Sequence, residues 1–127
     1  MTSQNRKNTH NRTLGKWGEN LAAEYLTARG YELLARNART GSGEIDLIAR
    51  KAGLLVFVEV KTRRGDEYGT PEEAITPAKQ QHMEDAAQAW LAEHPEETGA
   101  WQFDVIAIFH SPGMDQPEIT HLEGTLD

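Results

Sequence analysis

The sequence predicts an α/β fold in which helices flank a mixed central β-sheet, and three observations carry this prediction. Two stretches, residues 14–29 and 76–93, repeat apolar residues every three or four positions, as helices do. Segments rich in β-branched and aromatic residues lie between and after them, which gives the order α-β-β-β-α-β with a further short strand at the end. The length of 127 residues favours one compact domain.

The first predicted helix, over residues 14–29, carries an apolar stripe and is expected to end at Gly30. The stripe consists of Leu14, Trp17, Leu21 and Tyr25. Residues 1–12 are rich in Asn, Thr, Arg and Lys and lack periodicity, so we expect a disordered basic arm there. Residues 13–127 then form the single domain.

Three strands are predicted next. The first covers residues 31–36 and leads into the turn-rich residues 39–43. The other two, over residues 44–50 and 54–62, form a hairpin that can reverse at residues 52–53. The second hairpin strand is nearly all apolar and β-branched, so we expect it to be central and buried.

A second helix and two more strands complete the expected fold. After a polar loop over residues 63–75, Thr76 and Pro77 provide a helix cap and a first helical residue. The helix is expected to end near Glu93, ahead of a fourth strand over residues 101–109 and a short one near 119–122. Its inward residues are expected to be Met83, Ala86, Ala87, Trp90 and Leu91.

The predicted hairpin sets two carboxylates against each other. A turn at residues 52–53 places Asp46 directly opposite Glu59, and the same register places Glu44 opposite Lys61. Two carboxylates about 5 Å apart repel by roughly 3 kcal/mol at an effective dielectric of 20. A divalent cation between them would turn this repulsion into coordination, so the geometry indicates a metal site.

Strand alternation puts Glu59 and Lys61 on the same face, near the C-terminal end of an apolar strand. Burial of a Glu–Lys pair lowers the stability of the fold through desolvation, so such a pair is expected to serve a function. The alternative is a solvated strand end, because Glu-x-Lys is common by chance. The presence of Asp46 at the opposing register favours a functional site.

Each predicted helix adds one polar side chain to this site. Glu19 shares a face with small and apolar residues of the kind that pack closely on a sheet. Gln80 shares a face with Met83, so its amide is expected to point inward, with Lys79 beside it. For each, the alternative is an edge position from which the side chain reaches water.

Charge is divided unevenly along the chain, which has a net charge of −7. Residues 1–64 hold 12 of the 13 Lys and Arg and 6 of the 20 Asp and Glu, whereas residues 65–127 carry a net charge of −13. Such asymmetry points to a face that binds a polyanion, and solvated charges scattered in space explain it equally well.

Composition and spacing exclude several kinds of site. The chain has no cysteine, which excludes disulfides and thiolate metal sites. None of its five histidines has zinc-site spacing. No apolar run reaches membrane-spanning length and the N-terminus lacks a signal-peptide pattern, so we expect a cytoplasmic protein that does not enter membranes. Asp104 interrupts an apolar strand, either at its rim or in support of the acidic cluster.

The set of motifs resembles the YraN-like family of small bacterial proteins. This family belongs to the PD-(D/E)xK nuclease superfamily and is similar to archaeal Holliday-junction resolvases. The resemblance covers residues 14–122. It rests on Gly15, Gly18, Glu19, Ala22 and Ala23; on residues 43–48, 58–61 and Arg63; on Gly69, Pro71, Glu73 and Ala74; and on Lys79, Gln80, Ala86, Ala87, Trp90, Leu91 and residues 103–106.

The resemblance implies a restriction-endonuclease-like fold and an active site on these residues. Asp46, Glu59 and the backbone carbonyl of Val60 would be metal ligands. Lys61 would orient or activate the attacking water, Glu19 would be a further ligand or water holder, and Gln80 would be the polar residue from the second helix. Ile45 stands where the superfamily has a proline, a position that varies.

The expected function is therefore that of a Mg²⁺- or Mn²⁺-dependent DNA endonuclease, with selectivity for branched DNA as one form of it. The DNA backbone would be held by Arg36, Arg39, Arg63, Arg64 and Lys79. A junction resolvase would also need to be a homodimer. Two alternatives stay open: a nucleic-acid-binding module in DNA repair or uptake that cleaves nothing, and an acidic interaction protein that uses residues 65–127.

Overall fold

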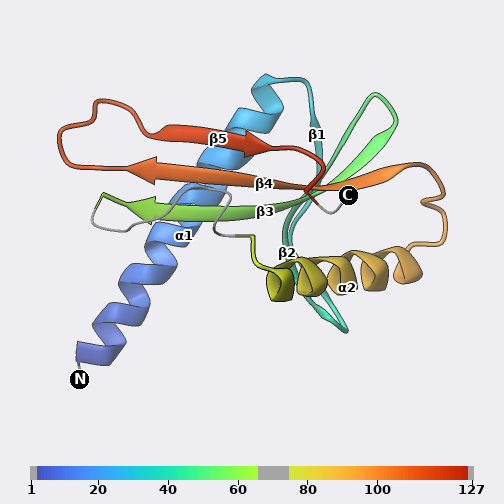
Figure 1. Cartoon of the computed structure of the whole chain (residues 1–127), viewed down its shortest axis with the longest axis horizontal. Helices are drawn as coiled ribbons and strands as arrows, with labels where there is room; N and C mark the ends of the chain where they lie inside the picture. Colours follow the sequence, from blue (N-terminus) through green and yellow to red (C-terminus); the bar gives the residue numbers. More distant parts are fainter. Residues whose placement is uncertain (1–2, 66–74, 126–127) are drawn as a thin grey trace.

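The computed structural model describes residues 3–65 and 75–125, and within them the side chains from Thr13 onward. Two helices and five strands succeed one another in this part of the chain (Figure 1). In chain order they are α1 (Ser3–Ala28), β1 (Glu32–Thr40), β2 (Gly43–Lys51), β3 (Leu54–Arg64), α2 (Pro77–Glu93), β4 (Trp101–His110) and β5 (Glu118–Leu122). The predicted α/β class and its element order are confirmed.

The five strands form one sheet in the order β1-β2-β3-β4-β5, so β3 is central, as predicted. Neighbouring strands are antiparallel except for β3 and β4, which are parallel. A parallel pair needs a crossover connection, and α2 lies in the connection between these two strands. The sheet is therefore mixed, with the crossover helix directly after the strand that carries Glu59 and Lys61.

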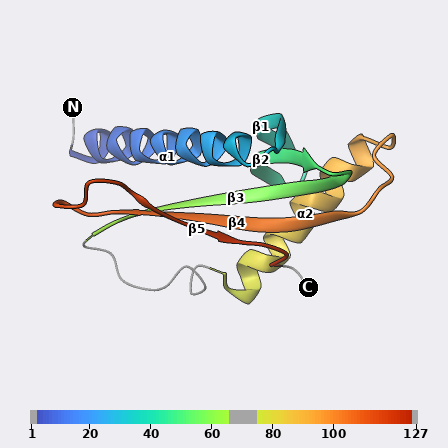
Figure 2. The same ribbon diagram turned by 90° about the horizontal axis from the view of Figure 1, so that it is seen from above.

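The two helices pack on opposite faces of the sheet (Figure 2), each above its own hydrophobic core. The core under α2 contains Phe57, Met83 and Trp90, and the core under α1 contains Leu26 and Val58. Because alternate side chains of β3 point to opposite faces, this strand contributes to both cores. It is therefore packed on both of its faces, and the candidate site lies toward its C-terminal end.

α1 is longer than predicted, because it begins at Ser3 where we expected a disordered arm over residues 1–12. No glycine or proline precedes Gly15, so nothing interrupts a helix that extends outward from its packed half. Its predicted end is confirmed: Ala28 is the last helical residue, and Gly30 has a positive φ of 88°.

The side of α1 that faces the sheet differs in part from the predicted stripe. Ala22 and Leu26 are buried, whereas Trp17 is 36% exposed and the other stripe residues are half-buried. Gly18 is also buried, and a methyl group there would overlap the Thr62 hydroxyl and lie 3.1 Å from the Thr62 Cβ. α1 therefore makes its closest approach to β3 at Gly18.

The β-hairpins follow the prediction with one extension. β1 continues to Thr40, beyond the predicted end, because it stays paired with β2 up to the Thr40–Gly43 pair. β2 and β3 reverse at Ala52 and Gly53, whose φ values of 51° and 81° are those of a tight hairpin turn. The predicted turn position is confirmed.

The predicted bounds of α2 are confirmed. The Thr76 hydroxyl accepts a hydrogen bond from the Lys79 amide at 3.1 Å, and Pro77 is the first helical residue. The predicted inward residues are buried, apart from the half-buried Leu91. Residues 66–74, with most of the predicted polar loop and the Gly69–Ala74 motif, lie outside the described residues.

Candidate functional site

The predicted register of the β2–β3 hairpin is confirmed from the turn up to the pair formed by Leu47 and Val58. The next two residues in this register are Asp46 and Glu59, and the ladder stops before them. In place of a ladder bond, the backbone N–H of Val60 donates to Oδ2 of Asp46 at 2.8 Å. The two strands thus diverge at the predicted metal ligands, and the Asp46 side chain fills the gap.

Asp46 is also unpaired on its other side, toward β1. The β1–β2 ladder is interrupted between the Arg36–Leu47 and Ala38–Ile45 pairs, at the level of Asp46. Across from Asp46, Asn37 has a positive φ of 51°, which breaks the extended backbone of β1. The Asp46 peptide is thereby released from both ladders, and its side chain becomes free to contact β3.

The Asp46 carboxyl lies in a negative environment. Its pKa is raised from 3.8 to about 6, mainly by burial and to a lesser extent by the charges of Glu59, Glu19 and Glu44, while the Val60 hydrogen bond opposes the increase. Carboxylates of α1, β2 and β3 thus lie near enough to Asp46 to affect its charge. Among the described residues, however, Glu19, Asp46 and Glu59 do not form a group whose ligand atoms all lie within 4.8 Å of one another.

Glu59 has a cationic neighbour on α2, since Nζ of Lys79 lies 2.9 Å from its Oε1. Lys79, which is predicted to bind DNA, thus forms an ion pair with a predicted metal ligand in this structure. A small pocket of about 130 Å³ lies at this point, beside the start of α2. Glu59, Lys61, Ile75, Thr76, Lys79, Met83 and Val105 line it.

Two predicted positions are wrong. Gln80 was expected to point inward, but its side chain is exposed, because the N-terminal turn of α2 directs Lys79 and Met83 toward the sheet. Glu44 was expected to face Lys61, but the β2–β3 ladder has already ended there. Glu44 instead pairs with Arg39 of β1, at 3.5 Å between side-chain atoms.

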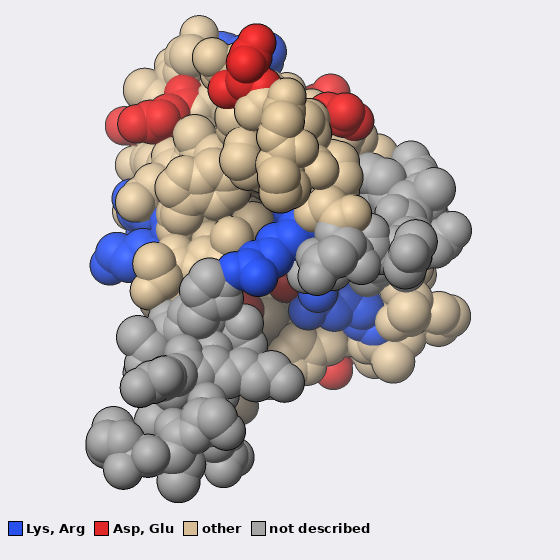
Figure 3. Space-filling model, turned by 90° about the vertical axis from the view of Figure 1, so that its left-hand side faces the viewer, with Lys and Arg blue, Asp and Glu red and all other residues tan. Residues whose placement is uncertain are grey.

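The predicted DNA-binding arginines lie in two separate places. On β1, Arg36 donates to the Asn20 side chain at 2.6 Å, and Arg39 pairs with Glu44. At the end of β3, Arg63 is half-buried and Arg64 is exposed. Figure 3 shows the face where β3 and β4 end: Lys and Arg side chains cross its middle, and acidic atoms are visible in the hollow beneath them.

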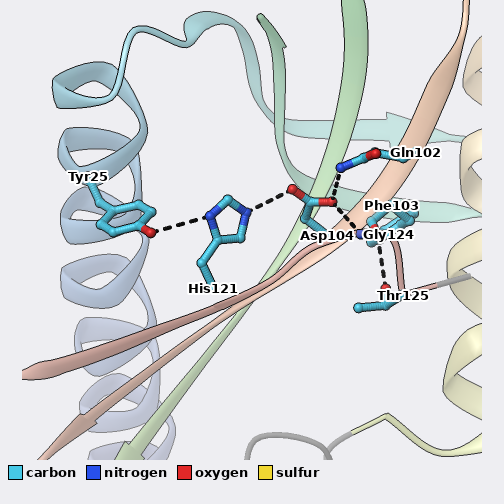
Figure 4. Close-up of polar contacts among 7 residues, drawn as sticks. All are labelled: Tyr25, Gln102, Phe103, Asp104, His121, Gly124 and Thr125. Carbon is cyan, nitrogen blue, oxygen red and sulfur yellow. Dashed lines mark hydrogen bonds and ion pairs between the residues drawn. The ribbon is translucent and has the colours of Figure 1, made fainter.

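A second polar cluster lies on the α1 face of the sheet (Figure 4). Asp104 is fully buried and accepts hydrogen bonds from Gln102 and Gly124, at 2.8 and 3.0 Å. Its other oxygen lies 2.8 Å from Nε2 of His121, whose Nδ1 is 3.4 Å from the Tyr25 hydroxyl. The cluster therefore connects β4, β5, α1 and the segment after β5.

This cluster also contains a set of side chains that could hold a metal ion. Among the described residues, Asp104, His121 and Glu123 are the three acidic or histidine side chains whose ligand atoms lie within 4.8 Å of one another. Sequence reasoning missed it, because His121 and Asp104 are 17 residues apart and meet only through the β4–β5 pairing.

Asp104 does not join the acidic cluster around Asp46. It is paired in register with Val58, whose side chain points toward α1, whereas the next residue, Glu59, lines the pocket beside α2. The expectation of a rim position was also wrong, because its carboxylate is completely buried. The two polar clusters thus lie on opposite faces of the sheet.

None of the helices in the described part of the chain combines the length and the hydropathy that crossing a bilayer requires.

Comparison with known proteins gives a consistent result. The model of the family described as "Uncharacterised protein family UPF0102" matches residues 18–108. A UPF0102 protein of Symbiobacterium thermophilum is 54% identical over 82% of this chain and 86% of its own length. UPF0102 proteins of Rhodococcus opacus and Syntrophotalea carbinolica are 50% and 46% identical, over 89% and 91% of this chain and 95% and 92% of their own lengths.

Proposed function

This chain belongs to the UPF0102 family, and from the geometry of its site we propose that it is a metal-dependent DNA endonuclease of the PD-(D/E)xK type. The family description states no activity, so the proposal rests on the site. The observation that carries it is the position of Asp46. It lies where the β2–β3 ladder ends, its carboxylate accepts a hydrogen bond from the Val60 amide of β3, and the charges of three other carboxylates act on it.

The donor set fits a hard divalent cation. Asp46, Glu59 and Glu19 offer carboxylate oxygens, and Val60 offers its backbone carbonyl, which are the donors that Mg²⁺ and Mn²⁺ prefer. The pKa of Asp46, raised in part by three neighbouring carboxylates, indicates an excess of negative charge that a cation would relieve. A bound Mg²⁺ or Mn²⁺ would supply an activated water and screen the charge of the phosphate.

The side chains of the protein would supply the other parts of catalysis and the binding of the nucleic acid. Lys61 is exposed, lines the same pocket as Glu59, and would stabilise the negative charge that develops on the phosphate oxygens. Glu19, half-buried on α1, would hold the attacking water from the other side of Asp46. The exposed Gln80 and the basic residues Arg36, Arg39, Arg63 and Arg64 would contact the backbone of the nucleic acid.

One observation favours a second function, that of a nucleic-acid-binding module without cleavage. Lys79 forms an ion pair with Glu59 at 2.9 Å, so an ammonium group lies where one metal ligand is expected. For cleavage to occur, Lys79 must leave Glu59 and contact the phosphate when the nucleic acid binds. A module that only binds would keep the ion pair.

The experiment is a cleavage screen over duplex, single-stranded and four-way-junction DNA with Mg²⁺ and with Mn²⁺. We expect cleavage by the wild type, none by Asp46→Asn, and wild-type cleavage by the control variant Glu84→Gln, which changes an exposed carboxylate of α2. Binding of all three DNAs without any cleavage would support the non-cleaving module.

If the protein resolves four-way junctions, it must also form a dimer. One domain of this size covers too little DNA to select a four-way junction by shape, so two copies would have to present two sites. Light scattering with and without a junction tests this. A monomer in both conditions would leave a nuclease that does not resolve junctions.

A further inference from the structure

An exposed aromatic side chain of α1 lies against the end of β4, on the face of the sheet opposite the pocket beside α2. Trp17 is 36% exposed, and its ring is 5.9 Å from the ring of His110 in an edge-on contact. His110, the last residue of β4, is paired in register with Arg64, the last residue of β3. Both line a pocket of about 370 Å³ together with Gly65 and Pro112.

The turn of α1 that carries Trp17 also carries Glu19. Gly18 lies against Thr62 of β3, and successive helical residues point about 100° apart. Trp17 is therefore directed to the β4 side, where it contacts His110, and Glu19, about 200° further around the helix, is directed away from it. One helical turn thus connects the candidate site to the aromatic pocket.

Arg64 and His110, which line this pocket, and Trp17, which contacts His110 beside it, match the chemistry of an unpaired nucleotide. Tryptophan and histidine rings stack on nucleobases, and a guanidinium binds phosphate or stacks on a base face. Bases within a duplex already stack on each other and offer no free face. The volume is at the low end of small-ligand pockets, which run from about 300 to 1,000 Å³, so it suits one base rather than a duplex.

The distance along β3 relates the pocket to the site. Arg64 is three residues beyond Lys61, and a strand rises about 3.3 Å per residue, so the two positions are separated by roughly 10 Å. A single strand whose phosphate lies at Lys61 would need only a few nucleotides to reach the pocket. Arg64 and His110 belong to the α1 face of the sheet, so the strand would pass the end of β3.

We propose that Trp17, His110 and Arg64 form a subsite for an unpaired base on a single-stranded segment of nucleic acid. The inference rests on the proposed function only for the identity of the polymer. The substrate of the candidate site would then contain a single-stranded portion, such as a tail, flap or branch, next to the phosphate that is cleaved. Binding at this subsite requires no metal.

The test measures binding in EDTA, where no cleavage can occur. The probes are a fluorescein-labelled oligothymidylate of about 12 nucleotides, its RNA counterpart, a duplex of the same length, and a strand with the same phosphates and no bases. Anisotropy gives the affinities. For the wild type we expect tighter binding of the two base-bearing single strands than of the baseless strand, and the ratio between DNA and RNA identifies the preferred polymer.

Trp17→Ala should weaken binding of the base-bearing strands by about 10-fold, as expected for the loss of one stacked base, and leave the baseless strand and the duplex unchanged. Leu34→Ala, which removes another side chain that is 36% exposed, is the control and should change nothing. Trp17→Phe should retain most of the affinity and lose the quenching of tryptophan fluorescence by the unlabelled oligothymidylate.

Equal affinities of the wild type and Trp17→Ala for the base-bearing strands would overturn the subsite. So would a loss that is the same for the baseless strand, since this would show a phosphate contact. Either result could occur with a fully active nuclease. Conversely, base-dependent binding without cleavage in the earlier screen would overturn the proposed activity and leave the subsite in place.

Discussion

The carboxylate of Asp46 accepts a hydrogen bond from the Val60 amide, just beyond the point where the β2–β3 ladder stops. This bond holds the carboxylate beside Glu59 and Lys61, the two neighbours of Val60 in the chain, and uses only one of its two oxygens. It also explains why an ionisable side chain can be placed at a break in an otherwise apolar hairpin.

The stability of the fold should depend on the charge of Asp46. Its pKa is about 6 in the folded state and 3.8 ordinarily, so between these values the folded chain binds the proton more tightly than the unfolded chain. The free energy of unfolding contributed by this group is therefore greatest below about pH 4, falls as the pH rises to about 6, and stays low above it. Asp46→Asn should be more stable than the wild type at pH 8, by up to about 3 kcal/mol, and equally stable at pH 4.

Urea unfolding at pH 4 and pH 8 checks this, with Glu84→Gln as a control that changes an exposed carboxylate. A gain that is equal at the two pH values would contradict the electrostatic explanation.

Binding of Mn²⁺ should depend on the carboxylates of Asp46 and Glu59. Added Mn²⁺ is expected to raise the melting temperature of the wild type at pH 8, and to do so less at pH 5, where Asp46 is mostly protonated. Asp46→Asn and Glu59→Gln should each abolish the increase. An increase of wild-type size in Asp46→Asn would show that Mn²⁺ binds elsewhere, and Asp104→Asn would then identify the other cluster.

Removal of the Lys61 amine should separate chemistry from binding. Lys61→Ala is expected to reduce the cleavage rate by about 100-fold or more, while the affinities for Mn²⁺ and DNA stay within a few fold. Lys51→Ala, at the opposite end of the hairpin, is the matched control. A loss of DNA affinity in proportion to the loss of rate would make Lys61 a phosphate anchor.

The Glu59–Lys79 ion pair should compete with a metal ion. Lys79→Met frees Glu59, so the affinity for Mn²⁺ should increase by a few fold, the size expected for a partly exposed ion pair. Titration of Mn²⁺ by calorimetry measures this. Unchanged affinity would show that Glu59 is not a ligand, or that Lys79 leaves it without cost.

The Asp104 cluster should act on stability and not on catalysis. Asp104→Ala leaves the His121, Gln102 and Gly124 donors without their buried acceptor, and we expect a loss of roughly 3–5 kcal/mol in the free energy of unfolding. Asp104→Asn keeps part of the network and should lose less. Wild-type Mn²⁺ stabilisation in Asp104→Asn would confirm that the network is structural.

The sequence predicts the local features well, and for physical reasons. The turn at Ala52 and Gly53 determines the hairpin register, which is as predicted up to the pair formed by Leu47 and Val58. Thr76 and Pro77 fix the start of α2 in the same way, because a helix cap depends only on neighbouring residues.

The features that the sequence does not predict depend on contacts between distant elements. The contact of Lys79, rather than Gln80, with β3 depends on how α2 is rotated on the sheet, and adjacent helical positions differ by about 100°. The burial of Asp104 depends on the pairing of β5 with β4, which brings His121 to it from 17 residues away. The break at Asp46 depends on the backbone of Asn37, in another strand.

The contact of Gly18 with Thr62 has a consequence for how freely this protein can vary. The missing Cβ at this position sets the separation of α1 from β3, and the two neighbours of Gly18 serve different places on the molecule. An added methyl group would force Thr62 or the helix to shift, and a shift of the helix would move Glu19 and Trp17 together. The glycine at this position therefore influences the positions of both side chains, and the effect of a substitution at either neighbour depends on it.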